Sequence, residues 1–80
     1  MSKIEILQQV EAIFRDIFDD DNITLNETTT TKEVDGWDSL SHFQIIDAIE
    51  KHFNIKFTSK ELLLWKNIGE MLDTICLKIG

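Results

Sequence analysis

The chain has 80 residues, a hydrophobic fraction of 42%, no proline and a formal net charge of −7. This length predicts one small domain over residues 1–80, too small for most self-contained enzymes, with enough apolar residues for a packed helical bundle. The acidic balance argues against nucleic-acid binding, because contact with phosphates requires clustered Lys or Arg. No apolar run is long enough to span a bilayer, so we expect a cytoplasmic protein with no membrane partner.

The first predicted element is an amphipathic helix from Lys3 to Phe18. Its apolar residues recur every three or four positions and form one stripe: Ile6, Leu7, Val10, Ile13, Phe14, Ile17 and Phe18. The other side of this helix is polar, so we expect the stripe to face a core.

A polar connection of about twenty residues follows the first helix, longer than the few residues typical between helices of a bundle. It is rich in Asp, Asn and Thr, so we expect it to be functional or to lie across the bundle, held by its few apolar residues: Ile23, Leu25, Val34 and Trp37. The acids also concentrate in this half of the chain: residues 1–38 hold ten acids and three bases, whereas residues 39–80 hold five of each.

No metal site is predicted in this connection. A calcium-binding loop starting at Asp19 has Ile23 at its fifth position and Thr24 where the loop requires glycine. The single cysteine, Cys76, has no nearby Cys or His partners at zinc-ligand spacing. A solvated acidic loop is therefore the favoured interpretation.

Three more helices are predicted after the connection. One runs from Ser39 to about Phe53, and a short one follows Thr58 or Ser59, either of which can cap it. The last helix extends from Asn67 to about Ile79, with Asn67 as its cap and an acid three residues later. The expected fold class is all-α, a four-helix bundle with a long first loop and a short third helix.

Ser39 is the residue whose role needs explaining, since it stands between an acid and a leucine at a predicted helix start. It could simply cap the helix. Nucleophilic catalysis is disfavoured, because Ser39 lacks the flanking glycines of a nucleophile elbow. His42 could contact Ser39 as a base, but the sequence does not suggest an acid that would orient it. We therefore expect no enzymatic activity, and we expect His42 to lie on the surface of its helix.

The sequence around Ser39 resembles that of acyl carrier proteins. Asp38, Ser39 and Leu40 match the attachment motif of that family. The apolar register between Phe43 and Phe53, the segment at residues 54–57, the short third helix and the closing amphipathic helix extend the likeness to nearly the whole chain.

The resemblance implies that Ser39 carries 4'-phosphopantetheine, transferred from coenzyme A by a Mg²⁺-dependent phosphopantetheinyl transferase. It also implies that Asp38 assists this modification, and that Leu40 contacts the transferase or packs locally. A phosphodiester on the first turn of a helix faces unpaired N–H groups and the positive end of the helix dipole. The other implied partners are an acyl- or aminoacyl-loading ligase and a downstream transferase or condensing enzyme, which a monomer would visit in turn.

Departures from the family pattern indicate what kind of carrier this is. Carriers of fatty acid synthesis generally have a strongly acidic second helix, whereas this one has two acids opposed by Lys51. We therefore expect a dedicated biosynthetic pathway, with partner recognition by shape and hydrogen bonding through His42, Phe43, Gln44, Asp47 and Glu50.

Bulky residues fall in or near the region where family carriers enclose an acyl chain, namely Phe43, Phe57, Leu62 and Trp65. If they fill this region, the cargo is short or polar. The alternative is that Trp65 only closes a compact core or lies half-exposed.

Two other functions remain open. One is a small helical protein-interaction adaptor that is never pantetheinylated and that tolerates loss of the Ser39 hydroxyl. The other is a peptidyl carrier domain of a larger synthetase, which is less expected because the chain shows no linker-like flanks.

Overall fold

The helices lie where the periodicity predicts them. The computed structural model describes residues 2–34 and 36–79. It has four α-helices: α1 (Lys3–Phe18), α2 (Ser39–Phe53), α3 (Ser59–Leu64) and α4 (Ile68–Ile79). A short 3-10 helix, η1 (Thr31–Glu33), interrupts the first loop and was not predicted. No strand occurs in the described ranges, so the all-α prediction is confirmed.

Short-range hydrogen bonds define where the helices begin. In α1, the Ser2 hydroxyl accepts the N–H of Glu5 while the Glu5 carboxylate accepts the N–H of Ser2. At α4, the side chain of Asn67 accepts the N–H of Glu70 (3.0 Å), as its predicted capping role requires. The left-handed conformation of Asn54 (φ 56°) ends α2.

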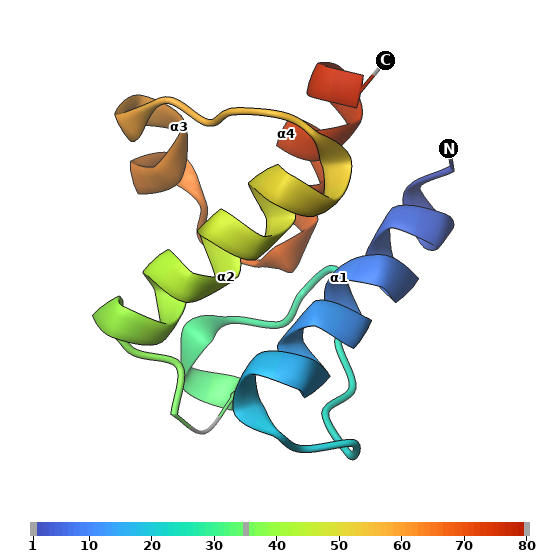
Figure 1. The fold of residues 1–80 in the computed structure, drawn as a ribbon, viewed down its shortest axis with the longest axis vertical. Helices are drawn as coiled ribbons and strands as arrows, with labels where there is room; N and C mark the ends of the chain where they lie inside the picture. The colour runs from blue at the N-terminus through green and yellow to red at the C-terminus, as the bar shows by residue number, and fades with distance from the viewer. Residues whose placement is uncertain (1, 35, 80) are drawn as a thin grey trace.

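One apolar core lies between α1, α2 and α4. Figure 1 shows α1 beside α2, with α4 behind α2 and α3 set to one side. Helix α1 contacts both α2 and α4. The fully buried side chains come from the predicted stripes of these three helices: Ile6, Val10, Phe14, Ile45, Ile49, Ile68, Met71, Leu72 and Ile75. No helix in the described ranges is both long and apolar enough to span a membrane.

The long first loop is fixed to the bundle by its apolar residues. Leu25 and Val34 join the core at 4% and 8% exposure, while Ile23 and Trp37 are half-buried against it. These four are the anchors that the sequence predicts. The loop therefore lies across the bundle and delivers residues 36–38 to the start of α2.

Backbone hydrogen bonds also connect this loop to α4. The N–H of Ile68 donates to the carbonyl oxygen of Thr29 (2.9 Å), and the N–H of Gly69 donates to that of Glu27 (2.8 Å). These two N–H groups belong to the first turn of α4, which has no partners for them within the helix. The loop thus satisfies donors that the helix itself leaves unpaired.

Candidate functional site

Asp38, rather than Ser39, caps helix α2. The Asp38 carboxylate accepts the N–H of Ser41 (2.9 Å), and Ser39 is the first residue of the helix. The interpretation of Ser39 as a helix cap is therefore wrong, because its neighbour already fills that role. Ser39 is exposed, and its hydroxyl makes no hydrogen bond to any other residue that the structure describes. The hydroxyl is thus both accessible and unused by the fold.

The carboxylate next to Ser39 is held in its ionised form. The backbone N–H of Ser41 is the main cause that lowers the pKa of Asp38 below its ordinary value, and the Ser41 hydroxyl adds to it. That hydroxyl lies 3.1 Å from the carboxylate and also donates to the carbonyl oxygen of Gly36 (2.7 Å). Asp38 therefore places a fixed negative charge beside Ser39.

Trp37 and His42 form a stacked pair behind Ser39. The indole N–H of Trp37 donates to Nδ1 of His42 (3.1 Å), and their rings lie 5.9 Å apart at 24°. Trp37 also meets Phe14 of the core edge-on, with ring centroids 4.9 Å apart. This pair connects the buried core to the first turn of α2.

The expectation that His42 lies on the helix surface is wrong. Its ring is half-buried, because Trp37 stacks on one side and Trp65 meets it edge-on at 6.3 Å. This burial lowers the pKa of His42 below its ordinary value of 6.5, so the imidazole is neutral at neutral pH. Surface placement failed as a prediction because both tryptophans lie outside α2.

An open groove runs from Ser39 toward α3. Its volume is about 440 Å³. We call it the aromatic groove, after the residues that line it: Trp37, Asp38, Ser39, His42, Phe43, Leu62 and Trp65. A second space of only about 30 Å³ lies among Trp37, His42, Trp65 and their neighbours. The room beside Ser39 is thus a surface groove, with little space beneath it.

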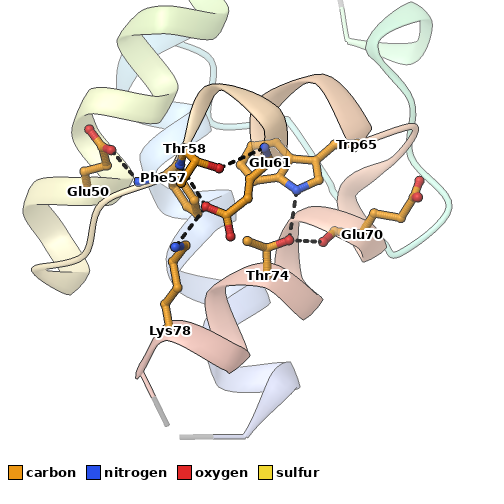
Figure 2. Close-up of polar contacts among 8 residues, drawn as sticks. All are labelled: Glu50, Phe57, Thr58, Glu61, Trp65, Glu70, Thr74 and Lys78. Atoms are coloured by element: carbon orange, nitrogen blue, oxygen red, sulfur yellow. Dashed lines mark hydrogen bonds and ion pairs between the residues drawn. The ribbon is translucent and has the colours of Figure 1, made fainter.

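Polar contacts hold α3 against the rest of the bundle (Figure 2). The hydroxyl of Thr58 and the carboxylate of Glu61 form a capping box that starts the helix. Glu61 also pairs with Lys78 of α4 (2.9 Å). Because Lys78 also lies over the ring of Phe57, it joins α4 both to α3 and to the residue just before the α3 cap.

Trp65 closes the far side of the aromatic groove. Its indole N–H donates to the Thr74 hydroxyl (3.0 Å), which itself donates to the carbonyl oxygen of Glu70 (Figure 2). Phe57 packs edge-on against Trp65, with ring centroids 5.0 Å apart. Both rings therefore fill space between α3 and α4, and Trp65 is half-buried.

The five residues predicted to recognise partners do not form one exposed face. Phe43 is 64% exposed, and Gln44 and Asp47 are also exposed. His42 packs between the tryptophans, and Glu50 is half-buried with its carboxylate accepting the N–H of Phe57 (2.8 Å). The sequence suggests that Glu50 faces solvent, because it is an acid on an amphipathic helix. Nothing near it in the sequence indicates that the segment with Phe57 folds back onto it.

Leu40 and Trp37 are placed more clearly by the structure than by the sequence. Leu40 is 70% exposed, so it contributes little to local packing and remains available to a partner. Trp37 was expected only to anchor the loop, and its indole N–H was overlooked as a donor. A half-buried tryptophan needs a partner for its N–H, and no spacing rule in the sequence assigns His42 to it.

No metal centre is found at this site. Within the described ranges, no group of three or more His, Cys, Asp and Glu side chains is arranged to hold a metal ion.

Comparisons with known proteins agree with this geometry. The sequence matches the family model described as the phosphopantetheine attachment site over residues 8–75. The structure is similar to the solution NMR structure of a holo acyl carrier protein from Geobacter metallireducens, with 42% identity, a TM-score of 0.86, and coverage of 91% of this chain and 84% of that one. No curated protein matches the sequence.

The family match covers most of the chain, and the structural match covers the same helices. Proteins of this family are carriers rather than enzymes, and their prosthetic group is a covalently attached 4'-phosphopantetheine. They interact in general with a phosphopantetheinyl transferase and with the enzymes that use their cargo. On these grounds the chain belongs to the acyl carrier protein family.

Proposed function

We propose that Ser39 is the attachment residue and that the chain presents an acyl or aminoacyl thioester to partner enzymes. The observation that carries this proposal is the exposed Ser39 hydroxyl, which the fold does not use, at the first position of α2. Because Asp38 caps the helix, a phosphodiester on Ser39 removes no hydrogen bond described in the fold. The residues present fit the prosthetic group, since the aromatic groove offers about 440 Å³ beside the attachment point.

In the modification, the Ser39 oxygen bonds to the phosphorus that carries pantetheine in coenzyme A. The bond from that phosphorus to the adenosine phosphate side breaks, and the hydroxyl proton passes to a base of the transferase. Asp38 lies beside the reacting hydroxyl, and its ionised carboxylate is suited to assisting the transferase's Mg²⁺. Leu40 supplies an exposed apolar contact next to the same hydroxyl.

We also propose a dedicated pathway rather than bulk fatty acid synthesis. Helix α2 has two acids, of which Asp47 pairs with Lys51 (2.9 Å) and Glu50 accepts a backbone N–H. Little free negative charge therefore remains on this helix to steer a basic partner. Recognition rests on the exposed side chains of Leu40, Phe43 and Gln44, aided by shape.

The proposed cargo is short or polar. Phe57 and Trp65 occupy the space between α3 and α4, and the space beneath the aromatic groove is about 30 Å³. A long apolar chain would have to displace a ring to be enclosed. A single carrier domain over residues 1–80, acting as a cytoplasmic monomer, completes the proposal.

The test is the intact mass of the protein after incubation with coenzyme A, Mg²⁺ and a broad-specificity phosphopantetheinyl transferase. We expect the wild type to gain one phosphopantetheinyl group and Ser39→Ala to gain none while keeping its helical circular dichroism. A matched control, Ser59→Ala at the first position of α3, should gain the group normally. No gain by the folded wild type would refute the proposal and favour the adaptor function.

A further inference from the structure

The aromatic groove contains few side-chain hydrogen-bond donors. Trp37 has one N–H, which His42 already accepts, and the N–H of Trp65 donates to Thr74. Asp38 is ionised and can only accept, while Ser39 is consumed by the attachment. Among the described polar side chains that line the groove, His42 alone has a further ring nitrogen that could donate.

The contact with Trp37 fixes which nitrogen of His42 carries the proton. An indole N–H can only donate, so Nδ1 of His42 must be unprotonated to accept it at 3.1 Å. A neutral imidazole with a bare Nδ1 has its hydrogen on Nε2. Nε2 is therefore an N–H donor.

That donor is not occupied by the fold. Within residues 2–34 and 36–79, Nε2 of His42 has no hydrogen-bond partner, and no buried side-chain nitrogen or oxygen lacks one. Nε2 therefore reaches solvent. His42 lies three residues after Ser39, which places both on one side of α2, and helical side chains lean toward the N-terminus.

We propose that His42 is an arm-positioning residue, whose Nε2–H donates a hydrogen bond to the phosphodiester of the 4'-phosphopantetheine on Ser39. This inference rests on the proposed function, because it requires the arm to be attached at Ser39. Trp37 takes part by holding the ring in the donating tautomer. The bond directs the first part of the arm along the aromatic groove and offsets the repulsion between the phosphodiester and Asp38.

Two charged residues line the spaces beside this imidazole. Asp38 shares the aromatic groove with it, and Lys66, from the connection between α3 and α4, lines the smaller space on the same ring. Both are present before and after the arm is attached. A comparison of the apo and holo proteins therefore isolates the effect of the phosphodiester.

The experiment is an NMR titration of apo and holo protein between about pH 5 and pH 8, with intact mass confirming the loading of each sample. The chain has two histidines, so His52, near the far end of α2, is an internal control. Loading should raise the pKa of His42 by roughly half a unit to one unit, the shift expected from an opposite charge about 4 Å away. The NMR signals of the His52 ring should be the same in the apo and holo proteins. The ³¹P signal of the arm should titrate with the same midpoint as His42.

Variants separate this role from a purely structural one. His42→Phe keeps a ring between the tryptophans but has no nitrogen, and His42→Gln restores a neutral donor and acceptor. Both should load, and both should lose the ³¹P titration, whereas the His52→Phe control should keep it. At fixed pH, the ³¹P shift of His42→Gln should lie nearer the wild type than that of His42→Phe.

The possible negative results distinguish the role of His42 from the attachment at Ser39. An equal His42 pKa in apo and holo protein, or a ³¹P titration that persists in His42→Phe, overturns the positioning role while the attachment stands. A wild type that gains no mass overturns the proposed function and this inference together. If His42→Phe fails to fold, the His42 pKa comparison and His42→Gln decide the question without it.

Discussion

Substitution of Gly69 by alanine should loosen the first loop from α4. A Cβ at this position would lie 2.8 Å from the carbonyl oxygen of Glu27, which is closer than carbon and oxygen atoms pack without a bond. The loop must therefore move away, which stretches the hydrogen bonds from Gly69 to Glu27 and from Ile68 to Thr29. The loop that positions Trp37 and Asp38 should lose part of its attachment.

The change in the free energy of unfolding follows from two costs and one gain. Overpacking costs about 1–3 kcal/mol, and two weakened hydrogen bonds cost about 1 kcal/mol each when lost completely. Alanine is favoured over glycine within a helix by about 1 kcal/mol. We expect the free energy of unfolding to fall by about 1–3 kcal/mol, which lowers the melting temperature by roughly 5–20 °C in a domain of this size.

The assay is thermal and urea unfolding followed by circular dichroism. Amide hydrogen exchange at positions 68 and 69 is compared between the wild type and Gly69→Ala. Leu77→Ala is the matched control, because Leu77 lies on the same helix and is 85% exposed. It should change stability by no more than about 0.5 kcal/mol. A melting temperature of Gly69→Ala equal to or above that of the wild type would refute the close-approach argument.

Three further predictions concern the groove and its supports. Glu50→Ala leaves the half-buried N–H of Phe57 without its acceptor and should lower the free energy of unfolding by about 1–3 kcal/mol, whereas Glu50→Gln should lose less; equal losses in urea unfolding would contradict this. Trp65→Phe removes the donor to Thr74 and should destabilise the fold by about 1 kcal/mol. In Trp65→Phe, a longer acyl chain than in the wild type should give the loaded protein its highest melting temperature. The same dependence of melting temperature on chain length in both proteins would count against Trp65 as the residue that limits cargo size. Backbone N–H groups lower the pKa values of Glu5, Asp38 and Glu61 in the folded protein. These carboxylates therefore stabilise the fold fully above their ordinary pKa values, 3.8 for Asp and 4.5 for Glu, and this stabilisation is lost as the pH falls through the lowered values. The urea midpoint should therefore fall in acid, less steeply in Asp38→Asn, and parallel curves would contradict the capping role.

The sequence predicts the helices well because their information is local. The stripes of α1, α2 and α4 repeat at helical spacing, and the caps Asn67 and Thr58 precede acids at the expected distance. The assignment of a cap failed by one residue at Ser39, since Asp38 and Ser39 are both good capping residues and spacing alone does not separate them.

The parts of the site that were missed depend on contacts across the fold. Trp37 meets His42 from a loop with no periodicity, and Glu50 turns toward an N–H seven residues away in an irregular segment. Neither contact has a spacing rule. The sequence shows that a tryptophan N–H or a carboxylate requires a hydrogen-bond partner when it is buried, but only the packed structure identifies that partner.

The cap on Asp38 leaves the hydroxyl of Ser39, the proposed attachment residue, out of the fold's hydrogen bonds, which has a consequence for its modification. Since the cap is independent of the hydroxyl, an enzyme that modifies Ser39 would meet a helix start that is already folded, without waiting for the helix to fray. With the arm on Ser39, as proposed, modified and unmodified molecules keep the same cap, so the start of α2 stays folded in both.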